Sequence, residues 1–180
     1  MAKEREEVDL PSLLKAIRKD ASYVKFKEIV ETAQARLDVE RDRRECFAIH
    51  AGRTARTLHG KKAYNPSSIQ EAEGKEIEAR SRLVEIRMKA AYQLEHVEKA
   101  CKAVEDHVLT EYNEEMRGYS NQDQRRALIR RVQKVAQNVL TDGKSLLDLC
   151  DRFIEDIDKV GYGLTNLTNL AVKILAGRAN

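Results

Sequence analysis

The most regular hydrophobic pattern of the chain lies in its last third. Apolar side chains recur there in steps that alternate between four and three residues, a heptad pattern typical of a helix with one buried face. Glycine costs a helix about 1 kcal/mol relative to alanine, so we expect bends near 143 and 161–163. The positions of this C-terminal seam are Leu128, Val132, Val135, Val139, Gly143, Leu146, Cys150, Phe153, Ile157, Val160, Leu164, Leu167, Ala171 and Ile174.

A short amphipathic helix is predicted within residues 1–22. Leu10, Leu13, Leu14 and Ile17 keep the spacing of one helical face, and Pro11 is compatible with a first helical turn.

A second helical pattern runs from about residue 23 to residue 58. Glu40 and Arg44 interrupt its apolar face midway. In a monomeric bundle this gap would be a packing flaw, whereas in an oligomer it would be a polar layer that fixes register. The apolar positions on either side are Val30, Ala33, Leu37, Phe47, Ala51, Ala55 and Leu58.

A basic loop at 59–68 is predicted to join this helix to a third one, which extends to about residue 117. Gly60 suits a helix C-terminus, Asn65-Pro66 suits a turn, and Ser68 with Glu71 matches a capping box. Residues 118–180 then form the C-terminal helical segment. The expected fold is all-α, an elongated antiparallel helical hairpin or bundle.

Composition supports the all-α prediction and limits the chemistry. The 180 residues include two prolines, eight glycines and no tryptophan, and 35% are charged, which is far from the turn-rich composition of an all-β chain. Three cysteines without close pairing indicate reduced thiols and a cytosolic protein. No signal peptide or apolar membrane span is recognisable, so we expect a soluble, cytoplasmic protein without a membrane partner.

Residues 146–164, LLDLCDRFIEDIDKVGYGL, concentrate reactive side chains without the arrangement of an active site. Cys150 lies on the apolar seam, and the acidic residues form a separate stripe that we interpret as a solvated face. No phosphate-binding loop, nucleophile motif or metal-binding pattern is recognisable. We therefore predict a non-enzymatic protein with no cofactor and no metal. The acidic stripe consists of Asp148, Asp151, Glu155 and Asp158.

Charge is segregated along the chain. Residues 41–62 carry seven basic side chains against two acidic ones, residues 117–134 carry six against one, and residues 95–115 carry seven acidic against two basic. Such blocks suit either a polyanionic partner or contacts between subunits.

Two predicted turns combine cations with tyrosine. Cationic side chains follow a phosphate backbone, and an exposed aromatic ring stacks on an unpaired base, so this combination favours single-stranded nucleic acid. The alternative is that these charges only solvate a long helical hairpin. The candidate nucleic-acid-binding residues are Arg53, Arg56, Lys61, Lys62 and Tyr64 in the first turn, and Arg117, Tyr119, Arg125, Arg126, Arg130 and Arg131 around the second.

The stretches ARTLHGKKAY and LLDLCDRFIEDIDKVGYGL resemble elements of the UvsY-type recombination mediators of tailed phages. The resemblance covers about forty residues of the chain. It implies an all-helical protein that forms a ring-shaped homo-oligomer, binds single-stranded DNA and loads a recombinase. It would place DNA contacts near Arg53, Arg56, Lys61 and Lys62. The C-terminal seam would then be the oligomer contact, through Leu146, Cys150, Phe153, Ile157, Val160 and Leu164.

Two functions therefore remain open from sequence. The favoured one is oligomeric binding of single-stranded DNA in recombination or a related nucleoprotein assembly, in the host cytoplasm if the chain is phage-encoded. The alternative is a structural assembly protein, such as a phage virion connector, a scaffold or another helical virion component, that binds only protein partners.

Overall fold

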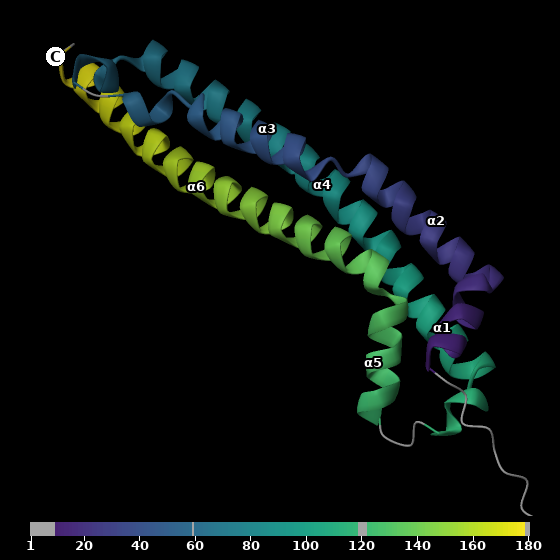
Figure 1. Cartoon of the computed structure of the whole chain (residues 1–180). Coiled ribbons are helices and arrows are strands. Elements are labelled where there is room, and N and C mark those ends of the chain that lie inside the picture. Colours follow the sequence, from purple (N-terminus) through teal and green to yellow (C-terminus); the bar gives the residue numbers. More distant parts are fainter. Residues whose placement is uncertain (1–9, 59, 119–121, 179–180) are drawn as a thin grey trace, which may run out of the picture. The chain divides into compact units, whose positions relative to one another are not determined.

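The computed structural model describes residues 10–58, 60–118 and 122–178, without the side chains of Lys61, Tyr64, Arg117 and Arg178. The described residues form helices and turns and contain no strand, which confirms the all-α prediction (Figure 1). The α-helices are α1 (Leu10–Lys19), α2 (Ala21–Arg36), α3 (Val39–Ala51), α4 (Pro66–Glu111), α5 (Gln122–Val132) and α6 (Lys134–Arg178). Short 3₁₀ helices are η1 (Ala55–Thr57), η2 (Gly60–Tyr64) and η3 (Glu115–Gly118).

The chain divides into two compact units, which are described separately. Unit 1 comprises residues 1–37 and 92–144, and unit 2 comprises residues 38–91 and 145–180. Helices α4 and α6 contribute to both units.

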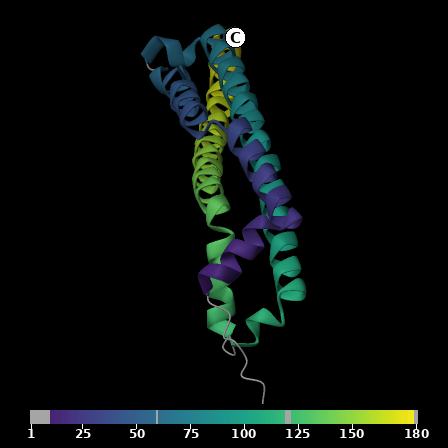
Figure 2. The same ribbon diagram turned by 45° about the vertical axis from the view of Figure 1, so that its right-hand side comes forward.

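Helices α4 and α6 are antiparallel within each unit. In unit 2, Arg80 pairs with Asp158 and Arg87 with Asp151, so residue numbers rise along one helix as they fall along the other. In unit 1, Lys144 Nζ lies 2.9 Å from Glu98 Oε1, and Gln133 donates to the carbonyl of Cys101 further along α4. Figures 1 and 2 show α6, in green to yellow, alongside α4, in teal.

The N-terminal amphipathic helix exists as α1 and buries Leu13 and Ile17, two of its four predicted apolar positions, completely. It stops at Asp20, whose side chain accepts a hydrogen bond of 2.7 Å from the backbone N–H of Ser22 and so caps α2. Helix α1 packs against α2 and α5 within unit 1.

The prediction of a single helix over residues 23–58 is wrong. Helix α2 ends at Arg36, and Asp38 starts α3 by accepting a 3.0 Å hydrogen bond from the N–H of Arg41. The new helix buries a different set of positions, which is why the apolar pattern looked interrupted. Glu40 and Arg44 are exposed, Cys46 is completely buried, and the predicted seam residue Phe47 is mostly exposed.

The connection before α4 also differs from the prediction. The last residues of the predicted helix form η1 instead, the basic loop contains η2, and α4 already begins at Pro66. Asn65 provides the cap, since its side-chain oxygen accepts a 3.0 Å hydrogen bond from the N–H of Ser67. The predicted capping box does not form, because Ser68 lies inside the helix and Glu71 pairs with Lys75 at 2.7 Å.

The C-terminal segment breaks at Gln133 instead of at its glycines. Helices α5 and α6 meet there, and the side-chain amide of Gln133 donates a hydrogen bond of 2.9 Å to the backbone carbonyl of Cys101. Helix α6 continues without a break through Gly143, Gly161 and Gly163. Gly143 has a packing role instead: a Cβ atom at that position would lie 2.5 Å from Leu94 Cδ2, so a larger residue would require the Leu94 side chain to shift.

Most positions of the C-terminal seam are buried within the unit to which they belong. Cys46 and Cys150, both completely buried, place their sulfur atoms 3.6 Å apart between α3 and α6, and both remain free thiols. The spacing of the cysteines in the sequence does not indicate that Cys46 and Cys150 lie next to each other. Phe153 and Val160 are partly buried, and the other four predicted interface residues, Leu146, Cys150, Ile157 and Leu164, are buried. Assigning those four to an oligomer contact was therefore wrong, because they already pack within one chain.

Candidate nucleic-acid interface

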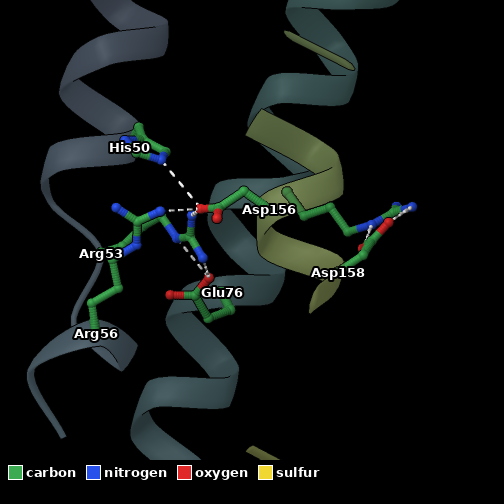
Figure 3. A network of polar contacts seen from close by, with 7 residues as sticks. His50, Arg53, Arg56, Glu76, Asp156 and Asp158 are labelled. Atoms are coloured by element: carbon green, nitrogen blue, oxygen red, sulfur yellow. Dashed lines mark hydrogen bonds and ion pairs between the residues drawn. The ribbon is translucent and has the colours of Figure 1, made fainter. Parts of the chain in front are cut away.

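The first predicted cationic turn is held in a polar network inside unit 2 (Figure 3). Arg53 follows α3. Its Nε donates a hydrogen bond of 2.7 Å to Glu76 Oε2 on α4, and its Nη1 donates one of 2.5 Å to Asp156 Oδ2 on α6. His50 Nε2 lies 3.2 Å from the same carboxylate oxygen, and the His50 ring stacks on Phe153 with centroids 4.1 Å apart. The network thus joins three helices through one arginine.

Burial makes this network structural. The side chains of Arg53 and Glu76 are 1% and 3% exposed, so neither charge can exchange its partner for a phosphate at the surface. Burial opposes the charged form of Asp156, but hydrogen bonds from Arg53, Arg56 and His50 outweigh it and lower the pKa of Asp156 below its ordinary value. The prediction that Arg53 contacts nucleic acid is therefore wrong: it neutralises the buried carboxylate of Glu76 and the partly exposed carboxylate of Asp156.

The other residues of the first turn give a mixed result. Arg56, in η1, is half-exposed, and its Nη2 donates to Asp156. Lys62 is exposed. The side chains of Lys61 and Tyr64 lie outside the described residues, so their predicted roles stay predictions.

Two of the four residues in the acidic stripe of α6 pair with arginines of α4. Asp158 accepts from Arg80 at 2.7 Å and Asp151 from Arg87 at 2.5 Å, while Glu155 pairs with Lys159 at 2.8 Å on its own helix. Within residues 10–58, 60–118 and 122–178, no group of His, Cys, Asp and Glu side chains is arranged to hold a metal ion.

The second predicted cationic region lies on α5, and its surroundings are different. Arg126, Arg130 and Arg131 are exposed. Arg126 lies 4.0 Å from Asp123, and Arg130 and Arg131 form no ion pair with any described residue. Arg125 is partly buried and already interacts within the chain. The side chain of Arg117 and the whole of Tyr119 lie outside the described residues.

Helix α1 adds further cations beside α5. The two helices pack against each other in unit 1, with Leu13 and Ile17 buried on α1 and Leu128 and Val132 buried on α5. Helix α1 exposes Lys15, Arg18 and Lys19, and it contains no acidic residue. Together α1 and α5 carry seven basic residues against one acidic residue, Asp123. We call the exposed cations Lys15, Arg18, Lys19, Arg126, Arg130 and Arg131 the α1–α5 basic surface.

Sequence reasoning missed half of this surface. The segment KAIRK of α1 showed three cations close together, but more than one hundred residues separate it from α5. It also missed that Glu76 and Asp156 neutralise Arg53, because only the packing of α4 and α6 brings these carboxylates to α3.

Comparisons with protein-family models, with curated proteins and with solved structures find no match to this chain. Among the described helices, none combines the length and the apolar composition needed to cross a membrane.

Proposed function

We propose that this chain is a non-enzymatic protein that binds single-stranded DNA through the α1–α5 basic surface. The observation that carries the proposal is the packing of two helices with seven basic residues against one acidic residue, several of them exposed and without an ion pair among described residues. Cations of this kind bind a phosphate backbone and release its counterions.

The preference for a single strand is supported by the sequence pattern in which Tyr119 accompanies the arginines of α5. A role beside a recombinase rests on the resemblance to UvsY-type mediators alone. The C-terminal seam is not part of the proposed function as an oligomer contact, because four of its predicted contact residues are buried within the chain.

Fluorescence anisotropy of a labelled single-stranded oligonucleotide, beside a duplex of the same sequence, tests the proposal. We expect binding that prefers the single strand and weakens log-linearly with salt, with a slope of about −0.7 for each phosphate contacted. Absence of binding at low salt would contradict the proposal. Equal binding of both DNA forms would contradict the preference for a single strand.

A second candidate function is structural assembly through protein contacts. Ile77 and Met88, eleven residues apart on one face of α4 in unit 2, are 70% and 64% exposed. Exposed apolar side chains on a common face are typical of interaction surfaces. Sedimentation velocity tests this alternative: it predicts an oligomer that Ile77→Glu and Met88→Glu dissociate, and a monomer at all concentrations would contradict assembly through copies of this chain.

A further inference from the structure

A groove in unit 1 lies between α2 and the part of α4 that follows residue 91. Its volume is about 400 Å³, and its lining includes Lys25, Ile29 and Arg36 from α2 and Tyr92, Gln93 and His96 from α4. This volume falls within the range of roughly 300–1,000 Å³ that is usual for small-molecule sites. A flat aromatic group the size of a nucleobase fits a groove of this volume.

The groove presents an aromatic pair to solvent. Tyr92 is 57% exposed, so much of its ring faces solvent. Its ring forms a T-shaped pair with His96, with centroids 4.4 Å apart and planes at 75°. His96 is exposed as well, so both rings offer surface on which a flat ligand can stack.

The polar side chains of the groove suit a nucleotide. Gln93 is buried and forms no hydrogen bond with another described residue, so its amide can offer a donor and an acceptor to a base edge. Lys25 and Arg36 are exposed, form no ion pair with a described residue, and lie eleven residues apart on one face of α2. Glu28 is the acidic residue of the lining.

We propose that this groove is a base-stacking subsite for single-stranded nucleic acid. An unpaired base stacks on Tyr92 beside His96, Gln93 contacts the edge of the base, and Lys25 and Arg36 bind the flanking phosphates. This inference rests on the proposed function, and the groove belongs to the same unit as the α1–α5 basic surface. It adds Tyr92 to Tyr64 and Tyr119, the tyrosines for which the sequence pattern predicts a stacking role.

The test separates base recognition from backbone binding. An oligothymidylate strand and an abasic strand of equal length are titrated by anisotropy against the wild type, Tyr92→Ala and Tyr92→Phe. Because stacking on an aromatic ring contributes about 5- to 100-fold in affinity per base, Tyr92→Ala should weaken oligothymidylate binding by that factor. Binding of the abasic strand should not change, and Tyr92→Phe should restore wild-type affinity.

Tyr162→Ala is the matched control, since Tyr162 is an exposed tyrosine on α6 in unit 2. Unchanged oligothymidylate binding by Tyr92→Ala would overturn the subsite and leave the proposed function intact, provided that both strands bind in a salt-dependent manner. A wild type that binds neither strand would overturn both. Photocrosslinking of a bromouracil-substituted strand should label the peptide that contains Tyr92, and labelling confined to α1 and α5 would contradict the subsite.

Discussion

The two regions rich in arginine differ in what faces them. Arg53 and Arg56 meet the carboxylates of Glu76 and Asp156, whereas Arg130 and Arg131 meet no carboxylate among the described residues. Both regions looked alike in sequence, with several cations near a tyrosine. The difference shows that a run of cations in the sequence stays unpaired only when the helices packed against it bring no acidic side chains.

The largest effect should follow from breaking the buried network of unit 2. Removing one partner from a buried ion pair leaves the other charge uncompensated and typically costs about 3–5 kcal/mol, so Arg53→Ala should lower the free energy of unfolding by that amount. Urea denaturation measures it. Lys62→Ala is the control, because Lys62 is an exposed cation nearby and should change stability by less than about 0.5 kcal/mol. Equal effects of the two variants would contradict the assignment of Arg53 to the interior.

Acid titration should reveal the same network with a smaller effect. The pKa of Asp156 is lowered in the folded chain, so its contribution to stability is present above the ordinary value of 3.8 and is lost as pH falls below it. Asp156→Asn should therefore flatten the decline of stability at acidic pH, as followed by thermal unfolding at a series of pH values.

Asp148 provides the matched control for this titration. It is exposed on the same helix and forms no ion pair with a described residue. Asp148→Asn should leave the acidic decline unchanged. A decline that is equally steep in wild type and Asp156→Asn would contradict the electrostatic role of Asp156.

The smallest effects should distinguish the glycines of α6. Nothing lies within 4 Å of a Cβ atom built at Gly161, so Gly161→Ala should stabilise the chain by about 0.5–1 kcal/mol through helix propensity. At Gly143 the same gain is opposed by displacement of Leu94, so Gly143→Ala should be neutral or destabilising by up to about 2 kcal/mol. Urea denaturation of both variants measures the difference, and equal stabilisation would contradict the close approach to Leu94.

Sequence periodicity was sufficient for the helical class and for most core positions, because a buried helical face repeats every three to four residues. It failed at the helix boundaries at Asp38 and Gln133, where a short break changes which residues face the core. Cys46 and Phe47 show the consequence, since Cys46, which is not on the predicted seam, is buried, whereas Phe47, which is on it, is exposed.

The candidate site was harder to predict for a different reason. Surface charge depends on which helices pack together, and the contacts between α1 and α5, or between Arg53 and Glu76, join segments distant in sequence. The cations of α5 could be identified from sequence, but neither their neighbours on α1 nor the neutralisation of Arg53 could.

The central claim is that unpaired cations of the α1–α5 basic surface bind the nucleic acid. The most direct test compares the double variant Arg130→Glu/Arg131→Glu with the control Lys102→Glu/Lys173→Glu. Both double variants change the net charge by the same amount. Lys102 and Lys173 are exposed and form no ion pair with a described residue. In anisotropy titrations with single-stranded DNA, the arginine variant should lose at least about tenfold in affinity and reduce the magnitude of the salt slope by about 1.4. The lysine variant should remain close to the wild type. Equal losses in both variants would show that net charge alone governs binding and would contradict the assignment of this surface.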